Sequence, residues 1–180
     1  MYKYRRPIVI LVAGCVITAC VSVTRVYYLP TNPEHVVENK SCGWVPSGGY
    51  YTTLTEDVAL SINATPESGG LWLSIQYILR SKNATIRMDD KTIYIQSPNQ
   101  VPIEINATSS NSNLSSLDPT IEIKGSKKND IQVSNYKIER FSPQEFTLSL
   151  PPLVASGKHC EVKPIKFKIV QKTGVLACVQ

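Results

Sequence analysis

Hydrophobic and polar residues alternate with a period of two over much of the chain after residue 57. The clearest run is Leu71–Leu79, in which leucine, isoleucine and tyrosine at odd positions alternate with a more polar set at even positions. Because successive side chains of a strand point to opposite faces, this run predicts a strand with one buried face. Similar runs predict strands at 58–62, 85–88, 91–96, 101–105, 120–124, 131–138, 146–150, 165–169 and 174–179.

Turn-forming residues separate these runs at intervals of roughly ten residues. Asp89-Asp90 predicts a hairpin that joins 85–88 to 91–96, and a turn explains this pair more simply than a calcium site does. Gln171–Gly174 predicts the tight turn of a last hairpin. The sequence therefore predicts an all-β protein, an immunoglobulin-like antiparallel β-sandwich of about eight or nine strands, with a small β-barrel as the alternative.

The first two dozen residues follow a different pattern. Met1–Arg6 is basic, and Pro7–Val23 contains seventeen residues without a charge. A basic stretch followed by an apolar run is the design of a secretory signal. The positive charges stay on the cytoplasmic side, so the segment predicts that the rest of the chain is exported.

Two tetrapeptides within the apolar run end in cysteine: Val12–Cys15 and Ile17–Cys20. Each has an aliphatic residue, two small residues and a cysteine, and so resembles the lipobox of bacterial lipoproteins. The resemblance covers residues 1–20 alone. It implies that the cysteine is diacylated, that the preceding peptide is removed, and that the new N-terminus is acylated in turn.

Cys20 is the favoured lipid-attachment residue and Cys15 the alternative. Cleavage before Cys20 leaves an apolar core of about ten residues, whereas cleavage before Cys15 leaves about five, short of the usual 7–15. Valine rather than aspartate follows either cysteine. In the lipoprotein class this implies sorting to the outer membrane.

The alternative is an uncleaved single-span anchor of a type II membrane glycoprotein. Seventeen uncharged residues lie at the lower limit for a spanning helix. Four Asn-x-Ser/Thr sequons support this alternative, at Asn63, Asn83, Asn106 and Asn113. For the favoured reading we expect a signal peptide over 1–19, a polar tether over 20–41 and one β domain over 42–180.

Three cysteines follow the N-terminal segment: Cys42, Cys160 and Cys178. In an oxidising compartment two of them are expected to form a disulfide, and three pairings are possible. A hairpin at Gln171–Gly174 would place Cys178 opposite a residue near Phe167, which disfavours a Cys160–Cys178 bond. There is no C-x-x-C motif of a redox or zinc site.

The net charge of +5 says little about partners. Lys3, Arg5 and Arg6 belong to the N-terminal segment, and the remaining sixteen basic and fourteen acidic residues leave a net charge of +2. A net charge of +2 over about 160 residues does not indicate a basic surface that binds nucleic acid, so a nucleic-acid partner is not expected.

Candidate chemistry is sparse. His159 and Cys160 are adjacent and would point to opposite faces of a strand, and His35 falls in the predicted tether. Glu104 and Glu122 each lie between isoleucines, as outward-facing residues do, which is a poor match to a glycosidase pair. No nucleophile-elbow, zinc-protease or nucleotide-binding motif occurs. We therefore expect no catalytic residue, metal site or cofactor.

These patterns predict a lipoprotein whose β domain is a non-catalytic structural or binding component of the bacterial envelope. The expected partners are the lipid bilayer and an envelope protein, and the expected location is the outer membrane, facing the periplasm or the cell surface. An envelope hydrolase of unrecognised type is a further alternative. Tyr27-Tyr28, Trp44 and Tyr50-Tyr51 are candidates for a binding face, although core packing explains most such residues.

Overall fold

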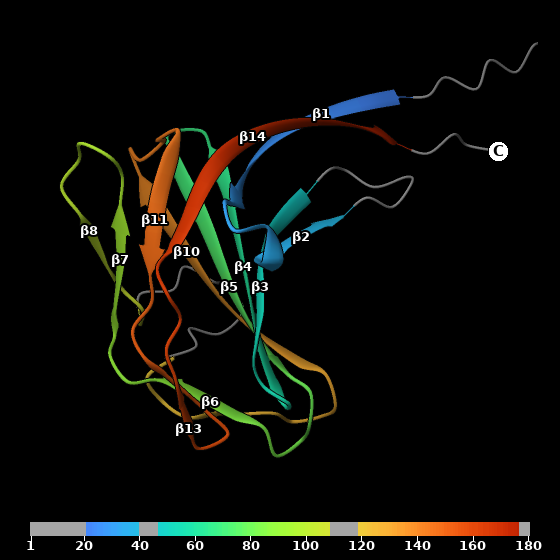
Figure 1. The fold of residues 1–180 in the computed structure, drawn as a ribbon, viewed down its shortest axis with the longest axis vertical. Helices are drawn as coiled ribbons and strands as arrows, with labels where there is room; N and C mark the ends of the chain where they lie inside the picture. The colour runs from blue at the N-terminus through green and yellow to red at the C-terminus, as the bar shows by residue number, and fades with distance from the viewer. Residues whose placement is uncertain (1–20, 40–46, 109–118, 177–180) are drawn as a thin grey trace, which may run out of the picture.

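The computed structural model describes residues 21–39, 47–108 and 119–176 (Figure 1). Within these ranges the chain forms strands and a single 3-10 turn, η1 (Pro33–His35), and no α-helix. The strands are β1 (Val21–Pro30), β2 (Val36–Asn39), β3 (Ser47–Thr55), β4 (Val58–Glu67), β5 (Gly70–Leu79), β6 (Thr85–Met88), β7 (Thr92–Gln96), β8 (Ile103–Asn106), β9 (Ile123–Lys124), β10 (Asp130–Glu139), β11 (Glu145–Ser149), β12 (Leu153–Ala155), β13 (Lys158–Cys160) and β14 (Ile165–Leu176). The prediction of an all-β protein is confirmed.

The strands form two antiparallel sheets. The larger sheet has the order β10-β5-β4-β1-β14-β11-β7-β8, and the β2–β3 hairpin joins it through β4. The smaller sheet has the order β13-β12-β6-β9. The two end strands of the larger sheet, β10 and β8, do not pair with each other in the described part of the chain. The sheet is therefore open, and the barrel that was the alternative is not formed.

Strands β4 and β5 form the centre of the core, where the alternation in sequence is clearest. The two strands pair along ten residues each. All five odd-numbered residues of β5 are buried, from Leu71 to Leu79, while the even-numbered ones between them are half-buried. Each apolar side chain fully buried in this way contributes about 1.5–3 kcal/mol. The strand predicted at 71–79 is confirmed, residue for residue on its buried face.

An aromatic cluster ties β1, β11 and β14 together. The ring of Phe146 stacks on Phe167 with centroids 5.1 Å apart, and Tyr28 meets Phe146 edge-on at 5.0 Å. The hydroxyl of Tyr28 donates a hydrogen bond of 2.7 Å to the carbonyl of Pro143. Because Tyr28 is completely buried, strand β1 belongs to the core of the domain.

Residues 21–39, expected to belong to a tether, are instead β1, η1 and β2. The expectation of a tether treated Pro30 and Pro33 as residues that prevent regular structure. In the structure Pro30 is the last residue of β1 and Pro33 opens η1, positions at which proline is tolerated. The valines and tyrosines of β1 have high strand propensity and supply the ladder with β14.

Two predicted hairpins are wrong. Strands β6 and β7 lie on either side of Asp89-Asp90 but belong to different sheets: β6 pairs with β12 and β9, and β7 with β11 and β8. The predicted turn at Gln171–Gly174 is the middle of one twelve-residue strand, β14. Gly174 lies opposite Val23, so the partner that keeps this stretch extended is β1, which the sequence pattern assigned to the tether.

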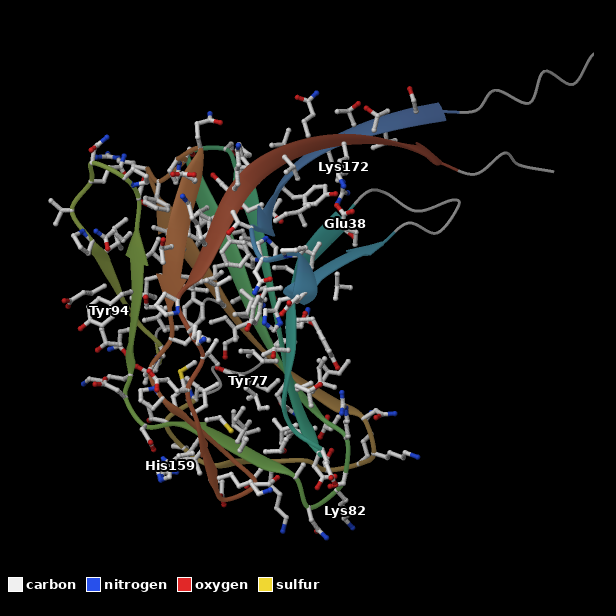
Figure 2. All side chains as sticks on the ribbon, viewed as in Figure 1. Glu38, Tyr77, Lys82, Tyr94, His159 and Lys172 are labelled. Carbon is white, nitrogen blue, oxygen red and sulfur yellow. The ribbon has the colours of Figure 1, made fainter. Side chains whose placement is uncertain are left out.

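The outer halves of β1 and β14 form a two-stranded ribbon, the arm, made of residues 21–27 and 170–176. It extends beyond the rest of the domain (Figure 1), because β1 pairs with β4 only at Tyr28 and β14 pairs with β11 only up to Lys168. An isolated ribbon of two strands is marginally stable. Lys172 of the arm forms an ion pair with Glu38 of β2, and the two side chains point toward one another in Figure 2.

Candidate functional site

A groove of about 590 Å³ lies at the base of the arm, between three segments. One wall is β3, through Tyr50 and Thr52–Leu54. The second is the segment 160–166, which runs from the end of β13 into the start of β14, and residues of the turn Thr31–His35 close the upper end. The volume of the groove lies within the range of about 300–1,000 Å³ that is usual for ligand sites.

The groove exists because one edge of β3 is left without a strand. β2 pairs with β3 over Ser47–Tyr50 only, and Pro33 opens η1 in place of a continued ladder. On the opposite wall the residues between β13 and β14 form no strand, and Pro164 has no N–H to donate. Tyr51–Leu54 therefore has a strand partner, β4, on one side alone among the described residues.

Side chains meet two carbonyl groups along this edge. His35 Nδ1 lies 3.1 Å from the carbonyl oxygen of Tyr51, and the thiol of Cys160 donates a weak bond of 3.7 Å to that of Leu54. Because backbone groups alternate in direction along a strand, the N–H and C=O of Thr53 point to the same side as those of Tyr51. Apart from the ladder with β4, in which Thr53 lies opposite Ala59, these two groups of Thr53 make no hydrogen bond among the described residues. A β-bulge after Thr53 ends the regular edge.

The groove has an apolar floor and a charged rim. Leu54, Val162 and Ile165 pack against or within the core and face the groove from below. Glu34, Glu161 and Lys163 stand exposed around it. Lys166 is held 3.2 Å from Glu145 in an ion pair. The rim thus carries both signs of charge and favours neither an anionic nor a cationic ligand.

Of the cysteines predicted to carry the lipid or to form a disulfide, the structure describes Cys160 and leaves the others outside the described residues. Cys20, Cys15, Cys42 and Cys178 lie outside the described residues, so lipid attachment stays a prediction. Cys160 is a half-buried free thiol, so neither of the two pairings that include it is present in the structure. Its place in the groove wall was not foreseen.

The two histidines make separate contacts. His35, expected to be solvated in a tether, is half-buried, with its ring centroid 4.9 Å from that of Tyr50. His159 is exposed at the lower end of the molecule (Figure 2), with Nδ1 3.3 Å from Asp89. His159 and Cys160 are neighbours in β13 and make separate contacts, to Asp89 and Leu54, as expected for opposite faces of a strand.

The tyrosines considered for a binding face are mostly core residues. Tyr27, Tyr28 and Tyr50 are buried, and burial raises the pKa of each hydroxyl above its usual value. Tyr51 is half-buried and accepts a 2.7 Å hydrogen bond from Arg80. Trp44 lies outside the described residues.

Other candidate chemistry from the sequence remains dispersed. Glu104 and Glu122 are exposed, and Asp90 accepts a hydrogen bond of 3.0 Å from the amide of Thr92, which makes it a turn residue. Within the described ranges, no three His, Cys, Asp or Glu side chains gather closely enough to hold a metal ion.

The groove was not predicted from the sequence because its walls are a strand of tyrosine and threonine and two proline-containing connections. The one available signal was the cluster of strong β-formers in Tyr50–Thr55, which alternates too weakly to be recognised as a strand. In the part of the chain that the structure describes, no helix is long and apolar enough to cross a bilayer. Comparison of the chain with protein-family models, with curated proteins and with solved structures gives no match.

Proposed function

We propose that this protein is an exported lipoprotein, anchored through Cys20 with Cys15 as the alternative, whose β domain is a non-catalytic binding component of the bacterial envelope. The anchor rests on the two lipobox-like tetrapeptides. One structural observation supports the arrangement: Val21 is the first residue of β1, whose outer half belongs to the arm that extends beyond the rest of the domain (Figure 1). A lipid on the preceding residue would then be attached to the tip of the arm.

The length of β1 supports a groove that stays accessible beside a membrane. From Val21 to Pro30 the strand has ten residues, and a strand rises about 3.3 Å per residue. Pro30, next to the upper end of the groove, is thus about 30 Å along the strand from the proposed lipid, well beyond the thickness of a lipid headgroup layer. We assign the outer membrane as the location, from the valine that follows either cysteine.

The contacts inside the groove support a binding role over a catalytic one. His35 and Cys160 both line it, but each is directed to a different carbonyl of β3, at Tyr51 and Leu54. Nucleophilic catalysis by cysteine needs the base within hydrogen-bond reach of the thiol. An envelope hydrolase is therefore not the function that we propose.

We propose further that the two sheets form a β-sandwich of the immunoglobulin-like kind. Buried residues of the smaller sheet, such as Ile86, Met88 and Leu153, belong to the same hydrophobic cluster as Leu60 and Ile62 of β4. One contiguous core with contributions from two antiparallel sheets is what a sandwich requires.

Mass spectrometry of the membrane-extracted chain tests the anchor. We expect loss of residues 1–19 and an added mass of two or three acyl chains, both abolished by Cys20→Ala and retained in Cys15→Ala. The reverse response of the two variants would move the anchor to Cys15. An intact, unlipidated N-terminus would refute the lipoprotein and favour the single-span anchor, above all if glycans were found on the sequons.

A further inference from the structure

We propose that the groove binds an extended peptide segment of a partner protein, which adds to the free edge of β3 as a further strand. This inference deepens the binding role proposed above and rests on it for the nature of the partner. Strand addition to an exposed sheet edge derives its affinity from main-chain hydrogen bonds and its specificity from pockets for alternate side chains. The groove offers both features.

The main-chain hydrogen bonds would come from Tyr51 and Thr53. By the alternation of a strand their N–H and C=O groups point away from β4, and outside the ladder with β4 those of Thr53 make no hydrogen bond among the described residues. His35 already places a side-chain nitrogen 3.1 Å from the Tyr51 carbonyl oxygen, where an incoming strand would place its own N–H. Tyr51–Leu54 spans about 10 Å, the length of three or four residues of an extended peptide.

No strand in the described part of the chain closes this edge. The turn that opens with Pro33 comes just before β2, which therefore begins only at Val36, and Pro164 lies just before β14 begins on the opposite wall. A proline lacks the N–H that a ladder needs and is found at edges for that reason. Exposed edges are usually covered or blocked in native proteins. An edge that no described strand covers, inside a groove of about 590 Å³, leaves room for a strand from another molecule.

The floor and rim define the chemistry of the peptide. In an added strand alternate side chains point down, toward Leu54, Val162 and Ile165, and the others point to solvent. The exposed rim residues Glu161 and Lys163 have opposite charges. The expected occupant is an extended segment with apolar residues at every second position and little net charge.

The test uses the full-length chain in detergent micelles and a phage-displayed library of random dodecapeptides. Peptides enriched on the wild type are synthesised, and their dissociation constants are measured by fluorescence anisotropy on three proteins: wild type, Thr53→Pro and Thr53→Ala. Both variants lose the hydroxyl that accepts a 3.3 Å bond from Arg80, but only proline removes the N–H that faces the groove. We expect a loss of about tenfold in affinity for Thr53→Pro and less than about twofold for Thr53→Ala.

Amide hydrogen exchange gives a readout that does not depend on how the proline variant folds. In the wild-type chain, bound peptide should slow exchange at the amide of Thr53 by about tenfold or more and leave the arm unaffected. Peptides that bind Thr53→Pro and Thr53→Ala equally well, or that leave the Thr53 amide unprotected, would overturn the proposal, as would a library that yields no enriched sequence. Cys20→Ala separates the two proposals, because it abolishes lipidation if the anchor is correct and leaves peptide affinity unchanged if the groove is correct.

Discussion

Replacing Tyr28 tests whether β1 is part of the folded domain. The side chain is completely buried, meets Phe146 edge-on with ring centroids 5.0 Å apart, and donates a hydrogen bond of 2.7 Å to Pro143. Tyr28→Phe keeps the ring and removes the hydroxyl, which leaves a carbonyl unpaired and should cost about 1–2 kcal/mol. Tyr28→Ala also empties the space of the ring and should cost about 3–5 kcal/mol, the usual range for large aromatic residues in a core.

Urea unfolding followed by far-ultraviolet circular dichroism would measure both changes. For a domain of this size each kcal/mol lowers the melting temperature by about 2–4 °C, so Tyr28→Ala should lower it by roughly 6–20 °C. Ser22→Ala is a matched control, since Ser22 lies exposed on the same strand and its loss should cost less than about 0.5 kcal/mol. If residues 21–39 were a tether, Tyr28→Ala would behave like Ser22→Ala, and that result would refute the assignment of β1 to the core.

Three further changes test other parts of the fold. Lys172→Met removes the ion pair with Glu38, a partly exposed contact that contributes about 1 kcal/mol or less, so hydrogen exchange should quicken in the arm while global stability changes little. Two hydrogen bonds from Ser126 lower the pKa of Asp130 in the folded state. Their contribution to the free energy of unfolding is therefore fully present above the ordinary aspartate pKa near 3.9, and it is lost as the pH falls through the lower pKa of the folded state. Asp130→Asn should flatten the dependence of the urea midpoint on pH in this acidic range. Gly70→Ala would place a methyl group against a backbone carbonyl of β10 and should cost about 1–3 kcal/mol, measurable as a lower urea midpoint; an unchanged midpoint would mean that β5 and β10 can separate.

The alternation of side chains predicted where most strands lie, because it reports directly on burial. Every residue that alternation assigned to the inner face of 71–79 is buried, and the runs at 58–62, 131–138 and 146–150 correspond to β4, β10 and β11. In each of these runs one face touches the core more closely than the other. The unequal burial of the two faces of a strand produces the period of two in the sequence.

Pairing between strands was predicted less well, because it depends on partners that are distant in sequence. Asp89-Asp90 forms a turn, but the strands on either side of it find other partners, β12 for β6 and β11 for β7. From the local sequence alone, Gly174 is typical of a turn. It lies within a strand because β1, about 150 residues earlier, supplies the ladder from Val21 to Pro30.

The groove could not be predicted from periodicity, because it is defined by backbone groups that no strand in the described part of the chain covers. Periodicity reports which side chains are buried and carries no record of which N–H and C=O groups stay unpaired. Residues Tyr50–Thr55 belong to β3 although their burial alternates poorly, since tyrosine and threonine favour a pleated backbone whichever face they occupy. A stretch of strong β-formers without alternation, followed or preceded by prolines, is what an edge strand at an open seam would be expected to show. If bound peptide protects the Thr53 amide from hydrogen exchange, this sequence pattern can be used to predict strand-addition sites.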